Sequence, residues 1–172
     1  TKACSVSLNL NGNLISCEDI FGSGFSHSEK LLPFISQTIK KSKIKMSDLS
    51  AVAISMGPGS FTGLRIGVST AKGICYALGI PLIAVSTLKA MAFGMAKKLK
   101  SELYCPMIDA RRMEVYSAFY DLENNLVRKI QADIVNESSY LNFLNNDVVF
   151  FGDGSAKIKE IIKNENAIFI SD

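Results

Sequence analysis

The chain has 172 residues, of which 48% are hydrophobic and 20% are charged, and its net charge is +3. This composition can form a hydrophobic core, which excludes a mainly disordered chain, and the charge balance gives no dominant basic field of the kind found in nucleic-acid-binding proteins. The longest uncharged runs, 49–64 and 73–88, are broken by Gly and Pro and are shorter than the roughly 20 apolar residues of a membrane span. The length fits one domain or two small ones.

An Asn11-Gly12 pair between two strand-like runs predicts a β-hairpin over 2–20, because both central residues of such a turn need a positive φ. A two-residue loop at this pair would place Leu8 opposite Ile15. The predicted register puts five apolar residues on one face of the hairpin: Cys4, Val6, Leu8, Ile15 and Cys17.

Helical and strand patterns alternate after the hairpin. Ser26 followed by Glu29 forms a capping-box pattern, and the apolar residues after it recur at helical spacing, which predicts a helix over 28–42. This order predicts parallel strands covered by helices. The elements expected next are a strand at 50–56, a helix at 62–78, a strand at 81–85 and a helix at 87–100.

The second half of the chain has a different pattern. Charge replaces hydrophobicity at 97–101, so we place a domain boundary there. The prediction is a first domain over 1–100 and a second, smaller α/β domain over 101–172. The second domain is expected to contain strands at 104–109, 114–120, 126–135 and 148–151, with short helices at 138–144 and 155–163.

The most distinctive motif is SMGPGSFTGLRIG at 55–67, a glycine-rich turn that leads into a predicted helix. Backbone amides at such a turn can hold a phosphate, and Gly57, Gly59 and Ser60 are the candidate residues for a nucleotide phosphate. The spacing matches neither the P-loop, which needs Lys where Leu64 stands, nor the dinucleotide fingerprint. The residues favour a tight structural turn, with phosphate binding as the alternative.

The predicted helix over 62–78 has two apolar stripes, one more than a helix needs to cover a sheet. The second surface could be covered by the 28–42 helix of this chain or by a partner, and the residues leave both open. The stripes are Leu64, Val68, Ala71, Cys75 and Leu78, and Ile66, Thr70, Ile74 and Ala77.

Few side chains have the pattern of a catalytic or metal site. His27 is the single histidine, and Ser26 beside it explains the local pattern as a helix cap, so we expect no catalytic residue and no metal. The cysteines form no CxxC pair and lie in apolar stretches, which predicts small buried hydrophobes in a reducing cytoplasm. They are Cys4, Cys17, Cys75 and Cys105.

A charged cluster follows the predicted strand at 104–109 and includes Asp109, Arg111, Arg112 and Glu114. A solvated turn is favoured over a contact site there. Lysine-rich segments at 40–45, 97–100 and 157–163 are predicted to be helix ends and solvated faces, with RNA contact at most auxiliary.

The GPGSFTGLRIG motif at 57–67 and the AKGICYALGIPLIAVSTL run at 71–88 closely resemble the bacterial TsaB family, formerly called YeaZ. The segments TKACSVSL, HSEKLLP, IDARRMEVY and GDG extend the resemblance over most of the chain. It implies an α/β fold of the actin-like ATPase, RNase H-like duplicated type, with two small domains and mixed sheets. It also implies that residues before Thr1 and a C-terminal segment after Asp172 are missing from this chain.

The resemblance implies a role in forming threonylcarbamoyladenosine in tRNA, next to the anticodon of tRNAs that read codons starting with A. The chain would be a cytoplasmic, non-catalytic partner and activator of TsaD, in a heterodimer that TsaE joins to form a larger complex, and a homodimer when alone. It would contact tRNA at most indirectly and no membrane. No cofactor is implied for the chain itself, and ATP or ADP could be bound in the assembled complex.

Family members are implied to associate through the first two helices of the first domain. The competing functions are a nucleotide-binding phosphotransferase or ATPase of the actin-like superfamily and a peptidase, which the single histidine disfavours. The implied partner interface consists of Leu31, Leu32, Ile35, Ile39, Gly63, Ile66, Gly67, Thr70, Ala71 and Ile74.

Overall fold

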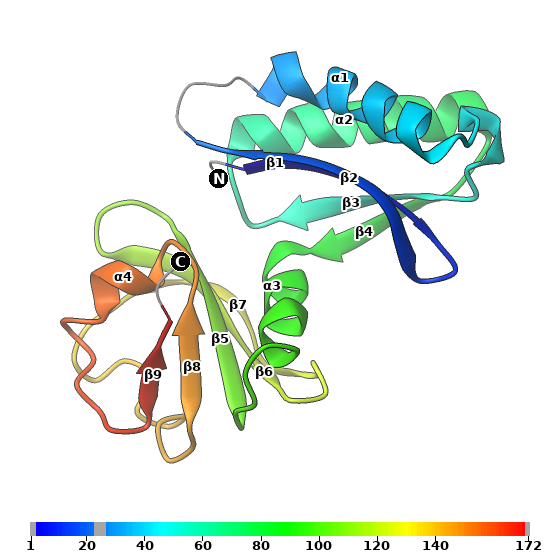
Figure 1. Cartoon of the computed structure of the whole chain (residues 1–172). Helices are drawn as coiled ribbons and strands as arrows, with labels where there is room; N and C mark the ends of the chain where they lie inside the picture. The colour runs from blue at the N-terminus through cyan, green and yellow to red at the C-terminus, as the bar shows by residue number, and fades with distance from the viewer. Residues whose placement is uncertain (1–2, 23–26, 171–172) are drawn as a thin grey trace. The chain divides into compact units, whose positions relative to one another are not determined.

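The computed structural model describes residues 3–22 and 27–170, and the chain forms two compact units, 1–85 and 86–172 (Figure 1). The boundary predicted at residue 100 differs from this division by one helix, α3 (Thr87–Ala96). Leu88 and Ala92 of α3 are buried in one core with Tyr104 of the following strand. The helix therefore belongs to the second unit, because its apolar side packs there.

The first unit begins with an antiparallel hairpin of β1 (Ala3–Leu10) and β2 (Asn13–Phe21). Asn11 and Gly12 have φ values of +51° and +81°, which confirms the predicted turn.

A β-bulge changes the predicted register of the hairpin. The pairing shifts between Leu8 and Asn9, and Leu8 pairs with Ser16 instead of Ile15. Because one extra residue reverses which side chains face inward, Ile15 and Cys17 are exposed. The predictions that Ile15 lies on the inner face and that Cys17 is buried were wrong.

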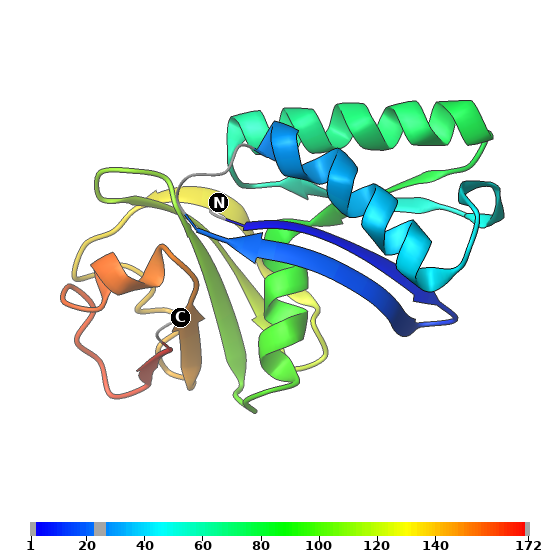
Figure 2. The same ribbon diagram turned by 45° about the horizontal axis from the view of Figure 1, so that its top comes forward.

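α1 (His27–Ser42) packs on the hairpin and also contacts α2 (Phe61–Leu78). The two helices lie side by side in both ribbon views (Figures 1 and 2). The predicted cap Ser26 lies outside the described residues, as does the side chain of His27.

The strand, helix, strand order predicted after α1 is confirmed. A 3-10 helix, η1 (Met46–Asp48), precedes β3 (Val52–Gly57), and α2 connects β3 to β4 (Leu82–Ser86). β3 and β4 are hydrogen-bonded neighbours and run in the same direction (Figure 1). α2 packs on β3, as a crossover helix does.

The second unit is built on a five-stranded mixed sheet of order β7-β6-β5-β8-β9. β6 is antiparallel to both β5 and β7, whereas β8 is parallel to β5 and to β9. The strands are β5 (Leu103–Asp109), β6 (Glu114–Asp121), β7 (Leu126–Ile134), β8 (Val148–Phe151) and β9 (Ala167–Phe169).

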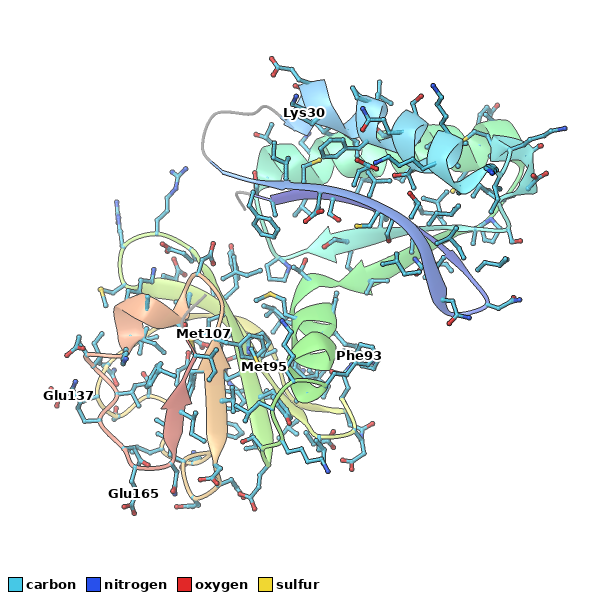
Figure 3. The ribbon with its side chains drawn as sticks, viewed as in Figure 1. Lys30, Phe93, Met95, Met107, Glu137 and Glu165 are labelled. Carbon is cyan, nitrogen blue, oxygen red and sulfur yellow. The ribbon has the colours of Figure 1, made fainter. Side chains whose placement is uncertain are left out.

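Alternate side chains of this sheet enter two separate cores. α3 covers one face, where Tyr104 and Ile108 are buried, and the other face holds Cys105, Met107 and Phe119 among others. Figure 3 shows Met95 on the side of α3 that faces the sheet, and Phe93 on the opposite side of the helix. Burial on both faces explains the nearly uninterrupted apolar sequence of β5 and β8.

Three predictions for the second unit need correction. Segment 138–144 forms successive turns instead of a helix, because Tyr140 has a φ of +68° that a right-handed helix does not accept. The predicted helix at 155–163 is shortened to α4 (Ser155–Ile158), and β9 was not predicted.

Candidate functional site

The glycine-rich turn at 57–60 joins β3 to α2 through contacts within the chain. The Ser60 hydroxyl accepts a hydrogen bond from the Gly63 amide at 3.3 Å and so caps the helix. Gly57 has a φ of +103°, and a Cβ at this position would lie 3.2 Å from Cδ1 of Leu64. These contacts give the turn a structural role, and phosphate binding by Gly57, Gly59 and Ser60 stays a prediction.

The predicted association residues on α1 and α2 differ widely in exposure. Leu32 is 61% exposed, whereas Ala71 is 4% exposed. A Cβ at Gly67 would lie 3.2 Å from Cδ1 of Ile54 in β3, so Gly67 faces the strand and cannot offer a close approach to a partner. Seven other members are half-buried: Leu31, Ile35, Ile39, Gly63, Ile66, Thr70 and Ile74.

The exposed face of α2 has an aromatic residue at each end that the sequence analysis missed. Phe61 is 73% exposed and Tyr76 is 93% exposed. Arg65 stacks over the Phe61 ring at 5.3 Å from its centroid. Both aromatic residues lie outside the two aliphatic stripes. Because Arg65 and Lys72 lie between them on the helix, the spacing of apolar residues in the sequence does not reveal these exposed aromatic side chains.

Lys157 of α4 holds the loop between β5 and β6. Its ammonium donates hydrogen bonds to Asp109 Oδ1 at 2.5 Å and to the carbonyl oxygens of Arg112 and Glu114 at 2.9 and 2.5 Å. The hydrogen bond from Lys157 holds the pKa of the Asp109 carboxyl below its ordinary value. The predicted charged cluster is an exposed turn, as expected, and Lys157 holds its backbone in place.

The GDG segment at 152–154 completes this arrangement. Asp153 Oδ1 accepts a hydrogen bond from the backbone amide of Asp109 at 3.0 Å. A Cβ at Gly154 would lie 3.0 Å from the carbonyl carbon of Ile108, so the two loops approach as closely as glycine allows.

Arg111 and Arg112 form the exposed tip of the β5–β6 loop, with φ values of +72° and +47°. This left-handed conformation costs a residue with a Cβ roughly 1–2 kcal/mol. Asn11 and Gly12 occupy the same conformation in the first hairpin with the residue types that tolerate it best.

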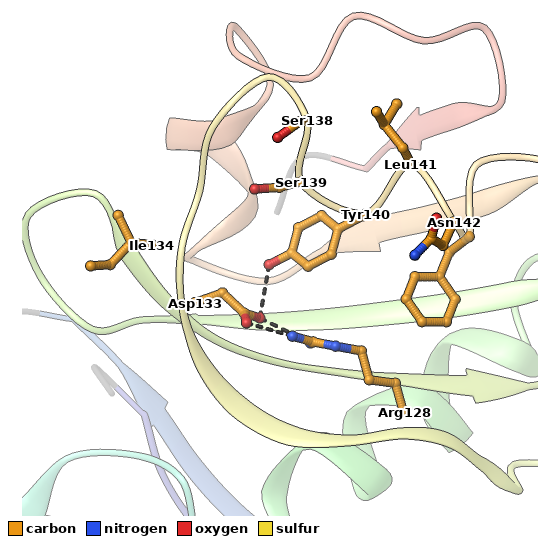
Figure 4. Close-up of a pocket in the computed structure, with 9 residues that line it drawn as sticks. Arg128, Asp133, Ile134, Ser138, Ser139, Tyr140, Leu141 and Asn142 are labelled. Carbon is orange, nitrogen blue, oxygen red and sulfur yellow. Dashed lines mark hydrogen bonds and ion pairs between the residues drawn. The ribbon is translucent and has the colours of Figure 1, made fainter.

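A buried polar network lies under β7, and the sequence analysis missed it (Figure 4). The Arg128 guanidinium pairs with the Asp133 carboxylate, with Nη1 at 2.9 Å from Oδ2. Asp133 also accepts hydrogen bonds from the hydroxyls of Ser117 and Tyr140, at 2.5 and 2.9 Å. Arg128 and Asp133 are an odd number of residues apart, which places them on opposite faces of a regular strand; an irregularity in β7 brings them to one face.

The environment of this network perturbs its titratable groups. Burial would raise the pKa of the Asp133 carboxyl, but hydrogen bonds from Arg128, Ser117 and Tyr140 outweigh burial and hold it below the ordinary value. Burial raises the pKa of the Tyr140 hydroxyl and that of the Cys105 thiol. A pocket of about 320 Å³ lies beside the network and is lined by Arg128, Asp133 and the 138–143 segment. Because the four side chains satisfy one another, the network fixes this segment over the core.

Within residues 3–22 and 27–170, no group of three or more His, Cys, Asp or Glu side chains is placed to hold a metal ion. None of the helices in the described ranges is long and apolar enough to cross a membrane.

Comparison with known proteins identifies the family. Residues 24–171 match the family described as TsaD, tRNA N6-adenosine threonylcarbamoyltransferase. The chain is 37% identical over 125 residues to the tRNA threonylcarbamoyladenosine biosynthesis protein TsaB of Escherichia coli, and 32% identical over 143 residues to that of Bacillus subtilis. The chain belongs to the TsaB (YeaZ) family. These alignments cover 73% and 81% of the chain but only 53% and 62% of the relatives, so the chain spans little more than half of their length.

A solved TsaB-family structure agrees with the fold. YeaZ from Pseudomonas aeruginosa is 26% identical, with a TM-score of 0.86 over 99% of this chain and 79% of that one. The predicted fold class, an actin-like, RNase H-like α/β fold with mixed sheets, is confirmed.

Proposed function

We propose that this TsaB-family chain acts in forming threonylcarbamoyladenosine in tRNA, as a non-catalytic partner and activator of TsaD. Its membership of the family carries the proposal, since two relatives at 37% and 32% identity are named biosynthesis proteins of this nucleoside. The match of 24–171 to the TsaD family supports a partner of related fold.

Exposed apolar side chains on α1 and α2 support the proposed association. Leu32, Phe61 and Tyr76 together expose one aliphatic and two aromatic side chains on these helices. Aromatic side chains with exposed rings are typical anchors of protein interfaces, and the neighbouring Arg65 adds a polar contact that interfaces favour. We therefore place the contact with TsaD, or with a second copy of the chain, on this face.

The same proposal includes the other partners, the nucleotide and the cellular compartment of the reaction. TsaE would join the TsaD complex, ATP or ADP would be bound in the assembly and not by this chain alone, and the reaction would take place in the cytoplasm. The Ser60 hydroxyl already caps α2, which supports a structural role of the glycine-rich turn over nucleotide binding.

The mass of the complex tests the proposed partnership. The protein is mixed with TsaD and passed over a size-exclusion column with light scattering, and we expect a species with the mass of a heterodimer or its multiple. ATP hydrolysis is measured on the protein alone. Separate elution of the two proteins would contradict the partnership, and steady ATP hydrolysis by the isolated protein would favour the phosphotransferase alternative.

A further inference from the structure

Two of the hairpin connections among the described residues, β1–β2 and β5–β6, contain two adjacent residues with positive φ. Asn11 and Gly12 in the first hairpin and Arg111 and Arg112 in the second all have φ between +47° and +81°. Asn and Gly accept this conformation readily, whereas Arg does not. Arg111 and Arg112 therefore hold a conformation that Asn or Gly would adopt at less cost, and their guanidinium groups are candidates for a function.

Hydrogen bonds fix the backbone of the β5–β6 loop, whereas its two arginine side chains are in no ion pair found among the described residues. Lys157 binds the carbonyl oxygens of Arg112 and Glu114, and the Asp109 carboxylate accepts the Arg111 amide at 2.7 Å. Both guanidiniums are exposed, and none of the ion pairs found among the described residues includes either of them. The loop thus presents two adjacent cations on a rigid support.

The acidic side chains of the loop take part in holding its backbone. Asp109 is paired with Lys157, and Asp153 accepts the amide of Asp109. Neither guanidinium is in any ion pair found among the described residues, although the charge of Arg111 also acts on the Asp109 carboxylate.

We propose that the Arg111-Arg112 turn binds phosphate groups of an RNA backbone. Guanidinium groups pair with phosphate oxygens through two parallel hydrogen bonds, and their fixed charge does not depend on pH. The loop projects from the end of the sheet (Figure 1), which suits a backbone running past it, whereas nucleotides bind in concave sites. The choice of RNA rests on the proposed function in tRNA modification.

Double substitutions test the role of the two arginine side chains separately from the conformation of the turn. The variant Arg111→Asn/Arg112→Gly places residue types that accept a positive φ at both positions and should melt at or above the wild-type temperature. Arg111→Lys/Arg112→Lys keeps both charges. The control Lys40→Ala/Lys43→Gly also removes two exposed positive charges, one of them at a residue with a φ of +58°.

The measurement is binding of a transcribed tRNA by the protein mixed with TsaD, over a range of salt concentrations. The slope of log K against log salt should fall in magnitude by about 2 in Arg111→Asn/Arg112→Gly, because two phosphate contacts are lost. The lysine variant and the Lys40/Lys43 control should keep the wild-type slope.

Three results would overturn the proposal. If the Arg111→Asn/Arg112→Gly variant kept the wild-type salt slope, the guanidinium groups would not contact RNA. If the Lys40→Ala/Lys43→Gly control lost as much slope, the attraction would be nonspecific. Loss of TsaD association in the Asn-Gly variant, seen by light scattering, would assign the turn to a protein contact. Formation of threonylcarbamoyladenosine by wild-type protein with TsaD is measured in parallel, so that failure of the turn proposal is distinguished from failure of the proposed function.

Discussion

The Lys157 ammonium lies 2.5 Å from the Asp109 carboxylate and ties α4 to the end of β5. The same ammonium binds two carbonyl oxygens of the β5–β6 loop, so one side chain holds three segments of the second unit. Loss of these hydrogen bonds in Lys157→Met should lower the free energy of unfolding by about 1 kcal/mol or more. Urea denaturation measures this change. Lys163→Met is the control, because its ion pair with Glu160 is exposed and should contribute little to stability.

The contribution of the Asp109 pair should depend on pH. The pKa of Asp109 in the folded protein lies below its ordinary value, so the stabilisation is present above the unfolded pKa and is lost as pH falls through the folded pKa. The stability difference between wild type and Lys157→Met should therefore shrink in the acid range below about pH 4, down to the part contributed by the carbonyl hydrogen bonds of Lys157. A stability difference that stays constant down to complete protonation would contradict the assigned pair.

Asp133→Asn should destabilise the second unit strongly. It leaves the Arg128 guanidinium, whose side chain is 18% exposed, without its anionic partner. Breaking a fully buried pair costs about 3 kcal/mol or more, so this half-buried pair should cost about 1–3 kcal/mol, whereas exposed Glu137→Gln should change the free energy of unfolding by less than about 0.5 kcal/mol. Calorimetric melting of both variants checks this, and equal melting temperatures would rule out a stabilising role of the network.

Gly152→Ala should prevent normal packing of the β8–α4 loop. An added Cβ would lie 2.4 Å from the Met107 carbonyl oxygen, and the φ of +93° at this position is unfavourable for alanine. The matched control is Gly94→Ala in α3, where the new methyl meets nothing within 4 Å and should stabilise the helix by about 0.5–1 kcal/mol. Melting temperatures should move in opposite directions, and a stable Gly152→Ala protein would show that the loop can shift.

Much of the fold could be predicted from the sequence, because local signals agree with it. The Asn11-Gly12 turn, the β3–α2–β4 crossover and the strands β5 to β8 follow from turn chemistry and hydrophobic patterns. The hairpin register failed at Ile15, since a bulge has no reliable sequence signal. The boundary before α3 depends on which core buries Leu88, and only tertiary packing decides that.

The candidate sites were less predictable. The sequence indicated the charged cluster around Asp109. It did not indicate Lys157 as its partner, because Lys157 lies 48 residues from Asp109 in the chain and only the position of α4 brings its side chain to the loop. The pairing of Arg128 with Asp133 requires an irregular strand, and the exposure of Tyr76 depends on the packing of α2 against β3.

Tyr76→Asp should block association with TsaD while leaving the fold intact. Tyr76 is 93% exposed, so its loss removes no core contact, but a charge in place of an aromatic side chain that anchors an interface is costly. Ile134→Asp is the control, because Ile134 is 76% exposed on β7, outside α1 and α2. Co-purification with TsaD should fail only for Tyr76→Asp, and retention by both variants would place the interface elsewhere.

Gly67→Leu should destabilise the first unit and is therefore a poor probe of association. The new side chain would collide with Ile54 of β3, so the melting temperature should fall in the isolated protein. A variant that folds normally would contradict the packing of α2 on β3.

We propose that this chain enables TsaD to modify tRNA without catalysing the step itself. The most direct measurement is the amount of threonylcarbamoyladenosine in digested tRNA, by mass spectrometry, after reaction with TsaD alone, with this protein alone and with both, in the presence of TsaE, ATP and the threonylcarbamoyl donor. We expect the modified nucleoside only when both proteins are present. Modification by this protein without TsaD, or equal modification by TsaD with and without it, would show that the proposed role is wrong.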